Sequence, residues 1–323
     1  MNKYLMKKIS IIAPCYNEEG NLKIFYSKIK EIFDQKLKHY SLELIIVDND
    51  STDKSIEILK ELTAKDKSLK VILNNVNYGL WRSTFNAIKY ATGDALLPLL
   101  PVDMQDPPEL LIDFVKKWEE GFDVVYGVKK SRNENSLIKI TRNIYYNLVS
   151  KISDIDIPPY VGEFQLIDKK IYKELLNFDD YYPYTRGLIS TLSSNKIGIN
   201  YTWQKRISGK SKMGLFKMFD VGINGIISFS NFPIRIFTII GLLLATISLL
   251  YIFIPVISYL FFPDRANPGI STLIVAIFFF SGIQLLFLGV VGEYVAAIHR
   301  QVRKPKKNVI VKELINISEN KNG

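Results

Sequence analysis

The chain is poor in the residues that build disulfides and metal clusters. Its 323 residues include one cysteine, Cys15, and two histidines, His39 and His299. A single cysteine cannot form a disulfide within the chain, which is typical of proteins in a reducing compartment. We interpret Cys15 as a small buried residue rather than a nucleophile, because free cysteine is among the most buried residue types. A zinc site of cysteine and histidine and a Ser-His-Asp triad are therefore not expected.

Two common phosphate-binding fingerprints are absent as well. The sequence has no G-x-G-x-x-G after its first predicted strand and no G-x-x-x-x-G-K-[ST]. It therefore predicts neither a Rossmann dinucleotide site nor a P-loop. The first 14 residues hold a charged start and an apolar stretch that is too short for the core of a signal peptide. We interpret that stretch as the first strand of a folded domain.

What the chain does have is two long apolar runs in its last third. They cover Ile234–Phe262 and Ile270–Ala297, and inside them only Arg235 and Glu293 carry charge. Each run exceeds the roughly 20 residues that are needed to cross the core of a bilayer. We therefore predict a hairpin of two transmembrane helices behind a water-soluble domain.

The formal net charge is +10, and basic residues gather beside the two apolar runs. By the positive-inside rule, this placement puts both flanks, and the domain before them, in the cytoplasm. Basic flanks would also attract a lipid phosphate. We favour this interpretation over nucleic-acid binding because the charge lies next to the apolar runs. The basic residues are Lys205, Arg206, Lys210, Lys212 and Lys217 before the first run, and Arg300, Arg303, Lys304, Lys306 and Lys307 after the second.

Short apolar runs alternate with helical periodicity before the hairpin. This alternation predicts an α/β domain with a parallel sheet covered by helices on both faces. The expected strands are Lys8–Ala13, Leu42–Val47, Leu69–Leu73, Ala95–Leu100 and Asp123–Gly127. The expected helices are Glu18–Phe33, Thr52–Ala64, Leu80–Ala91, Pro107–Glu119 and Lys139–Ile152. For Met213–Asn231 we favour an interfacial helix over a core helix, because it precedes an apolar run, and we expect a polar, mobile tail after Lys307.

Polar clusters follow four of the predicted strands. In an open α/β sheet, ligands bind beyond the carboxyl ends of the strands. The clusters are rich in carboxylates and amides, which suit a hard divalent cation. They are Pro14–Glu19, Asp48–Asp53, Asn74–Gly79 and Pro101–Pro108.

An ordered set of motifs, followed by the hairpin, resembles glycosyltransferase family 2. The chain is most similar there to the polyprenyl-phosphate glycosyltransferases, such as dolichyl-phosphate mannose synthase and the bacterial undecaprenyl-phosphate glucosyl and aminoarabinosyl transferases. The motifs are Pro14–Glu19, Val47–Asp53, Ala91–Asp94, Asp103–Glu109, Asp123–Gly127, Gly162–Phe164, Arg186–Leu188, Arg206–Lys212 and Gly292–Tyr294.

The resemblance implies a GT-A fold and an inverting transfer of a sugar from a nucleotide sugar to polyprenyl phosphate, undecaprenyl phosphate in a bacterium. It also implies Mg²⁺ or Mn²⁺, a multi-pass protein of the bacterial cytoplasmic membrane with both termini in the cytoplasm, and a homo-oligomer. No nucleic-acid partner is expected. The implied parts are a GT-A catalytic domain (1–212), a juxtamembrane amphipathic helix region (213–233), two transmembrane helices (234–297) and a basic cytoplasmic tail (298–323).

On the donor side, the resemblance assigns nucleotide binding to residues after the first two strands. Tyr16 can stack on a base and Glu18 can accept from ribose hydroxyls, although an ordinary loop would use the same residue types. The donor-binding residues implied by the resemblance are Pro14, Tyr16, Glu18 and Asp48, with Arg206 and Lys212 from a loop that closes over the donor.

The metal is expected at Asp103 and Gln105. The family pattern here is Asp-x-Asp-x-Gln-Asp-Pro-Pro, and Pro101 stands where its first aspartate would be. A divalent ion that bridges two phosphates needs only one or two protein oxygens. We therefore expect a weaker metal site with Asp103 as a catalytic residue. The alternative is that Asp103 lies in a turn before a helix that starts near Pro107.

On the acceptor side, Glu163 is the second expected catalytic residue and would orient the sugar or the acceptor. A strong base is not needed, because the attacking lipid phosphate is already ionised. Cations are needed to hold that phosphate, although any single lysine is more often a solvated surface charge. The expected acceptor-phosphate residues are Lys129, Arg142, Arg186 and Lys210.

Several positions depart from the family pattern together, namely Asn49, Pro101, Leu80 and Gln165. A different donor sugar would explain them, and so would a catalytically degenerate relative that binds a nucleotide sugar or a partner without turnover. A third alternative, a polymer-building family 2 enzyme, is disfavoured because its Gln-x-x-Arg-Trp motif and additional spanning helices are not present.

Overall fold

The computed structural model describes residues 6–131, 161–180, 183–204, 230–261, 269–303 and 309–317. The predicted helix Lys139–Ile152, residues 213–229 of the predicted interfacial helix, and Arg142, Arg206, Lys210 and Lys212 lie outside these ranges. The chain divides into two compact units, and we describe each by itself. The first contains Met1–Lys151, Ile155–Asp220 and Lys304–Gly323, and the second contains Ile152–Asp154 and Val221–Arg303.

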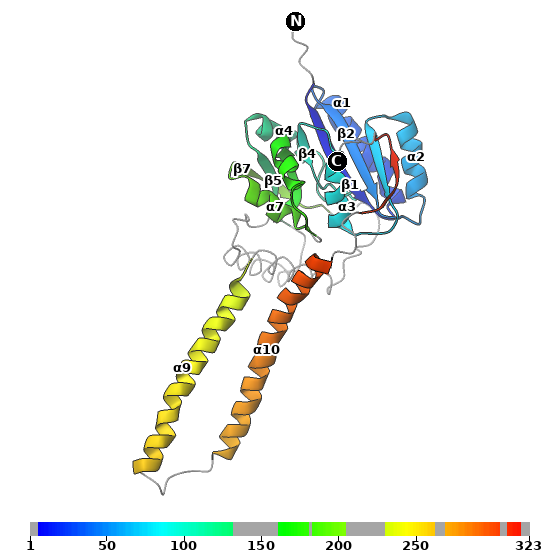
Figure 1. Cartoon of the computed structure of the whole chain (residues 1–323). Helices are drawn as coiled ribbons and strands as arrows, with labels where there is room; N and C mark the ends of the chain where they lie inside the picture. The colour runs from blue at the N-terminus through cyan, green and yellow to red at the C-terminus, as the bar shows by residue number, and fades with distance from the viewer. Residues whose placement is uncertain are drawn as a thin grey trace. The chain divides into compact units, whose positions relative to one another are not determined.

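An eight-stranded sheet forms the centre of the first unit in the described part of the chain, in the order β7-β5-β6-β4-β1-β2-β3-β8 (Figure 1). Its central strands are nearly continuous runs of buried apolar residues, as expected for strands covered on both faces. The strands are β1 (Lys8–Cys15), β2 (Ser41–Asp48), β3 (Leu69–Asn74), β4 (Ala95–Leu97), β5 (Val124–Ser131), β6 (Val161–Asp168), β7 (Lys196–Thr202) and β8 (Val311–Ile315).

The five predicted strands all run parallel, as predicted, but the sheet is mixed because two strands that were not predicted, β6 and β8, run antiparallel to their neighbours. Strands β3, β2, β1 and β4 run parallel, and so do β5 and β7. Strand β6 is antiparallel to both β4 and β5, and β8 is antiparallel to β3. From the sequence we expected only strands that alternate with helices, which run parallel, and a strand that joins the sheet without such a crossover helix can run in reverse. Because β6 runs in reverse, its first residues lie at the carboxyl ends of the parallel strands.

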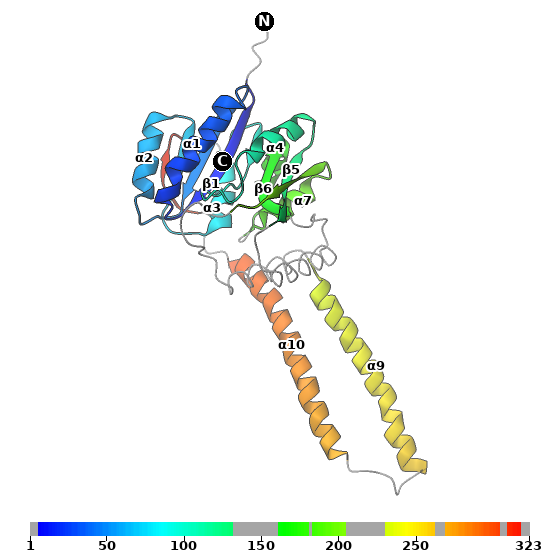
Figure 2. The same ribbon diagram turned by 180° about the vertical axis from the view of Figure 1, so that it is seen from behind.

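Helices cover both faces of the sheet. Helices α1, α2 and α4 pack on the face that holds the main apolar core, where Phe25, Leu59 and Phe114 are fully buried, and Figure 2 looks onto α1 on this face. The first helix follows from its sequence, because Leu22, Phe25 and Ile29 recur with helical spacing. The helices of this unit are α1 (Glu19–Gln35), α2 (Ser55–Lys65), α3 (Leu80–Ala87), α4 (Leu110–Glu119), α6 (Lys169–Leu175) and α7 (Thr185–Leu192).

The chain after Lys307 corrects the expectation of a mobile tail. Val311–Ile315 forms β8 and pairs with β3 at the edge of the sheet (red in Figure 1). Asn316, at φ 58°, donates from its side chain to the carbonyls of Thr63 and Leu69, at 3.0 and 2.9 Å. The tail was expected to be mobile because its composition is polar, but edge pairing satisfies backbone groups whatever the side chains are.

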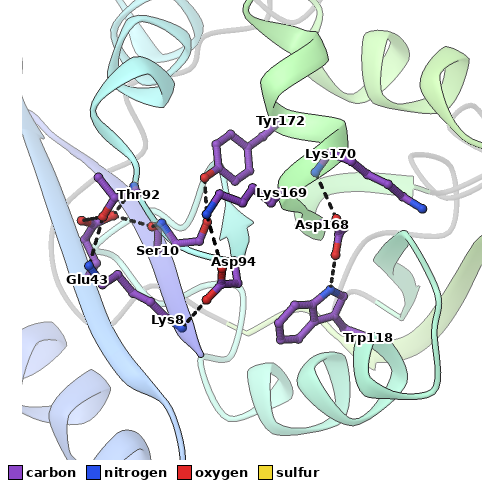
Figure 3. A network of polar contacts seen from close by, with 11 residues as sticks. Lys8, Ser10, Glu43, Thr92, Asp94, Trp118, Asp168, Lys169, Lys170 and Tyr172 are labelled. Carbon is purple, nitrogen blue, oxygen red and sulfur yellow. Dashed lines mark hydrogen bonds and ion pairs between the residues drawn. The ribbon is translucent and has the colours of Figure 1, made fainter. Parts of the chain in front are cut away.

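A buried polar network ties the strands together at the end of the sheet where the parallel strands begin, which we call the amino edge. The carboxylate of Glu43, on β2, accepts from Ser10, from the backbone and hydroxyl of Thr92, and from Lys70 at 2.6 Å (Figure 3). Tyr172 adds a bond to the carbonyl of Gly93 at 2.6 Å. Each partner stabilises the buried charge, so this network anchors β1, β2 and β3 to the turn before β4.

The second unit contains two long helices, α9 (Phe232–Phe261) and α10 (Ile270–Arg303). They contact each other through the rings of Phe237 and Phe287, whose centroids lie 4.5 Å apart. Large apolar side chains such as Phe278, 76% exposed, remain uncovered. Within the described residues, one segment, Ala276–His299, is long and apolar enough to cross a membrane.

Candidate functional site

The opposite end of the sheet, where the parallel strands stop, gathers most of the predicted site residues, and we call it the carboxyl edge. Strands β1 and β2 end there at Cys15 and Asp48, and the start of β6 lies beside the end of β5. Burial raises the pKa of the Cys15 thiol, which supports its interpretation as a buried apolar residue. The described residues brought to this edge are Pro14, Tyr16, Glu18, Asp48, Asp103, Gln105, Lys129, Glu163 and Arg186.

The loops after β1 and β2 are bound to each other. The backbone N–H of Asn17 donates to the hydroxyl of Ser51 at 2.9 Å, and the N–H of Thr52 donates back to the side-chain oxygen of Asn17 at 2.8 Å. The N–H of Glu18 donates to Ser55 at 3.0 Å. These cross-links hold the half-buried side chain of Tyr16 beside Glu18 on a fixed frame, as a binding surface for a planar base and its ribose would require.

Asp48 is fully buried beneath these loops. Its carboxylate accepts from both the backbone N–H and the hydroxyl of Ser51, at 2.9 and 2.5 Å. Burial raises the pKa of this carboxyl, and the Ser51 bonds oppose the rise. Asp48 therefore shapes the loop after β2, and direct contact with a nucleotide stays a prediction.

Asn49, a departure from the family pattern, has a structural role. Its amide donates to the hydroxyl of Ser83 on α3 at 2.9 Å and accepts from Asn74, at the end of β3, at the same distance. Ser83 in turn donates to the carbonyl of Gly79 at 2.6 Å. This chain of neutral bonds fixes the start of α3 against the ends of β2 and β3, and asparagine supplies both the donor and the acceptor that it needs.

The loop after β4 carries Asp103 and Gln105. Asp103 is 5% exposed, and its carboxylate accepts from the backbone N–H of Gln105 at 3.3 Å. Met104, between them, has a φ of 52°, which turns the chain sharply. No group of three or more His, Cys, Asp or Glu side chains that could hold a metal ion occurs in the described ranges. A metal at Asp103 would therefore take most of its oxygen ligands from a bound phosphate or from water.

Asp106 and Lys129 form a buried ion pair next to this loop. Their charged atoms are 3.2 Å apart, and Asp106 also accepts from the hydroxyl of Tyr201. The ammonium of Lys129 lies 5.3 Å from the ring centre of Trp203. The loop is further fixed by the N–H of Gln204, which donates to the carbonyl of Gln105 at 2.9 Å. Lys129 is thus positioned by its partners rather than being a solvated surface charge.

Glu163, at the start of β6, is a half-buried carboxylate of the carboxyl edge. The guanidinium Nε of Arg186 lies 3.7 Å from it, which is longer than a hydrogen bond. Burial raises the pKa of Glu163, while Arg186, Trp81 and Lys129 act against the rise. Arg186 is itself held by Tyr184 at 2.5 Å and by the carbonyl of Val161 at 3.3 Å. The predicted residues Glu163, Arg186 and Lys129 therefore meet in one place.

The sequence did not single out several residues that the structure places in this region. The sequence predicts Trp81 only as part of a helix and includes Asp106 only within a polar cluster, whereas both lie among the charged residues described above. Tyr201 and Trp203 come from β7 and the residue after it. One signal for Trp81 is its position directly after the Asn74–Gly79 cluster, since residues at such strand ends tend to face ligands.

Comparison with known proteins identifies the family. The profile of glycosyl transferase family 2 matches residues 10–176. The chain is 37% identical to the uncharacterized glycosyltransferase YkcC of Bacillus subtilis, over 91% of this chain and 90% of that protein. It is 32% identical to the SfII prophage-derived bactoprenol glucosyl transferase of Shigella flexneri, over 94% of this chain and 98% of that protein. The mannosyltransferase PcManGT from Pyrobaculum calidifontis, solved with GDP-Man and Mn²⁺, superposes with a TM-score of 0.48 at 14% identity, over 94% of this chain and 89% of that chain.

The sequence match and the architecture agree. The profile begins within β1 and ends just after α6, so it covers the parallel centre of the sheet, β6 and every described loop of the carboxyl edge up to Glu163. The mixed sheet with helices on both faces is the GT-A fold that the motifs led us to expect. The chain belongs to glycosyltransferase family 2, and it is a glycosyltransferase.

Proposed function

We propose that the protein transfers a sugar from a nucleotide sugar to a polyprenyl phosphate, undecaprenyl phosphate in a bacterium, with inversion at the anomeric carbon. The main support for this proposal is that Glu163, Arg186 and Lys129 lie close together at the carboxyl edge. Asp103 lies on the same edge. The match over nearly the full length of a protein named bactoprenol glucosyl transferase supports this acceptor.

The donor occupies the side of the edge formed by the loops after β1, β2 and β4. Tyr16 and Glu18 bind the nucleoside, and Asp103 with Gln105 faces the diphosphate. A divalent ion, Mg²⁺ or Mn²⁺, bound there would neutralise charge on the leaving nucleoside diphosphate. One carboxylate fits such an ion, because Mg²⁺ is commonly bound by one or two carboxylates together with substrate phosphates. With Pro101 in place of a second carboxylate, the ion binds weakly without donor.

The acceptor occupies the side formed by β5, β6 and α7. Arg186 and Lys129 hold the lipid phosphate, whose oxygen attacks the anomeric carbon from the face opposite the leaving group. That oxygen is ionised at neutral pH, so the site needs to position it rather than deprotonate it. Glu163 orients the transferred sugar between the two halves.

The helices α9 and α10 bring the catalytic domain to the lipid. We propose that both cross the membrane as a hairpin, with both chain ends in the cytoplasm. The uncovered apolar side chains along both helices and the basic residues beyond them support this placement. The described segment Ala276–His299 satisfies the length and hydropathy of a span by itself.

The test is product formation by the full chain, purified in detergent, with undecaprenyl phosphate, radiolabelled nucleotide sugars and Mg²⁺ or Mn²⁺. We expect a lipid-linked sugar that EDTA abolishes, and at least a 1000-fold lower rate for Asp103→Asn. The matched control is Asp113→Asn, which removes an exposed carboxylate on α4. A rate of Asp103→Asn equal to that of the control would refute the metal site.

A second function is favoured by one observation, the loss of a carboxylate at Pro101 without three grouped metal-binding side chains in the described residues. A degenerate relative would bind a nucleotide sugar or a partner without turnover. Calorimetric binding of a nucleotide sugar, together with no lipid product for any donor, would select this alternative.

A further inference from the structure

One indole N–H at the carboxyl edge makes no hydrogen bond of ordinary geometry within the described residues. The Nε1 atom of Trp81, in the first turn of α3, is buried and has no hydrogen-bond partner. The other buried tryptophan with a defined partner behaves differently, since Nε1 of Trp118 donates to the carboxylate of Asp168 at 2.8 Å (Figure 3). A buried donor without an acceptor is costly, and such groups in native proteins call for an explanation.

The acceptor that faces Trp81 is the carboxylate of Glu163, but no hydrogen bond of ordinary geometry joins the two groups in the described residues. Trp81 is among the groups that act on the carboxylate of Glu163, together with Arg186 and Lys129. Arg186 also stops short of a hydrogen bond, at 3.7 Å. The carboxylate therefore has donors on several sides: the indole N–H of Trp81 and the backbone N–H of Arg186 both act on it, and the guanidinium Nε of Arg186 lies beyond hydrogen-bond distance. A ligand group that binds between Trp81 and Glu163 would give the buried indole N–H an acceptor of good geometry.

The position of α3 indicates what that group is. The helix starts directly after the loop that follows β3, and the chain of bonds through Asn49 ties it to the donor side of the edge. Glu163 belongs to the acceptor side. A side chain that reaches from one side to the other lies where the transferred sugar must lie, between the nucleoside diphosphate and the attacking phosphate.

A sugar hydroxyl fits this pair of groups chemically. A hydroxyl both donates one hydrogen bond and accepts others, so it can accept from the indole N–H and donate to the carboxylate at the same time. We propose that Trp81 is a specificity-determining residue that, with Glu163, holds one hydroxyl of the donor's sugar. The ligand class is a pyranose with a free hydroxyl at the contacted carbon, and an analogue that lacks this hydroxyl is rejected because both protein groups stay unpaired. The inference rests on the proposed function.

The test uses Trp81→Phe, which removes the N–H and keeps an aromatic ring, with Trp118→Phe as the matched control. The full chain is titrated calorimetrically with UDP, UDP-glucose and UDP-N-acetylglucosamine, and with GDP and GDP-mannose. For the best donor, we expect Trp81→Phe to weaken binding of the nucleotide sugar by about 10-fold and to leave binding of the matching nucleoside diphosphate unchanged. Trp118→Phe should change neither. The deoxy analogue of that donor should bind the parent and Trp81→Phe equally.

A double-mutant cycle separates a shared contact from a structural effect. If Trp81 and Glu163 hold the same hydroxyl, the losses in Trp81→Phe and Glu163→Gln are not additive in the double variant. Equal losses for the nucleotide sugar and the diphosphate, or additive losses, would overturn the inference. Its failure differs from that of the proposed function, because the cycle measures binding, whereas the proposed function fails only if the parent forms no lipid-linked product.

Discussion

Two glutamates at opposite edges of the same sheet have opposite surroundings. At the amino edge, Glu43 accepts hydrogen bonds from Ser10 and Thr92 and pairs with Lys70 at 2.6 Å, and these partners lower its pKa although it is buried. At the carboxyl edge, Glu163 has Arg186 at 3.7 Å, and burial raises its pKa. A buried carboxylate whose partners lower its pKa stabilises the fold, whereas one whose counter-ion lies beyond hydrogen-bond distance and whose pKa stays raised is suited to bind a ligand.

The two tryptophans show the same contrast. Trp118 donates to Asp168 at the amino edge, whereas the indole N–H of Trp81, at the carboxyl edge, has no hydrogen bond of ordinary geometry to any described residue. The difference is one of location and not of residue type, since a glutamate and a tryptophan occur in both settings. Of the two tryptophans, the one that lacks a partner of good geometry among the described residues, Trp81, lies at the edge where the site is.

The largest expected effect is on turnover at Glu163. Replacing it by glutamine keeps the size of the side chain and removes its charge, so the sugar and acceptor lose a group that orients them. We expect kcat to fall by about 100-fold, while the midpoint of thermal unfolding stays the same or rises. The measurement is steady-state transfer to undecaprenyl phosphate next to a melting curve. A large loss of stability in Glu163→Gln would show that the two edges do not differ as argued.

Glu43→Gln should give the reverse result. Removing one member of a buried, hydrogen-bonded ion pair leaves Lys70 without its counter-charge and costs about 3 kcal/mol of stability. Turnover per folded molecule should be unchanged, because Glu43 lies at the far edge. Denaturant unfolding combined with kcat, corrected for the folded fraction, checks both statements. A drop in kcat with unchanged stability would contradict them.

The dependence of stability on pH should have opposite signs for the two groups. The folded pKa of Glu43 is lowered, so its stabilising contribution is complete above the unfolded pKa, about 4.3, and is lost as the pH falls through the folded value. The folded pKa of Glu163 is raised, so its ionisation costs stability as the pH rises from about 4.3 through the folded value. Melting midpoints of the parent, Glu43→Gln and Glu163→Gln across this range measure the two slopes, and equal slopes would remove the contrast.

Much of the first unit could be predicted from the sequence, because its signals are local. The apolar runs at β1 and β2 and the spacing in α1 predict these elements to within a few residues. The second helix shows the size of the error, since it is predicted at Thr52–Ala64 and observed at Ser55–Lys65. Strand direction was not predictable in the same way. The reversal of β6 and the pairing of β8 depend on contacts between residues far apart in the chain.

The sequence could predict which residues lie in the site where these residues stand at the ends of strands. Asp103 and Glu163 could be expected there from the motifs alone. The interactions that define their environments could not, because Lys129 meets Asp106, and Trp81 approaches Glu163, only after β5, β6 and α3 are placed by the fold. Asn49 and Gln165 looked like changes in the site, but both turn out to bond within the protein, Gln165 to the carbonyl of Gly162 at 2.9 Å.

The smallest effect is expected at Asn316. It tests whether a change at the amino edge stays without effect on the carboxyl edge. Its side chain donates to three carbonyls, including Asp66 at 3.4 Å, where β3 begins, and its φ of 58° is a conformation that glycine adopts freely. Asn316→Gly should cost about 1 kcal/mol for the lost hydrogen bonds, and Asn316→Ala about 1 kcal/mol more for the backbone conformation. Denaturant unfolding of both variants measures the two steps. Neither should change KM for the donor, because the contacts lie at the amino edge, and a raised KM would show that β8 couples that edge to the loop after β3.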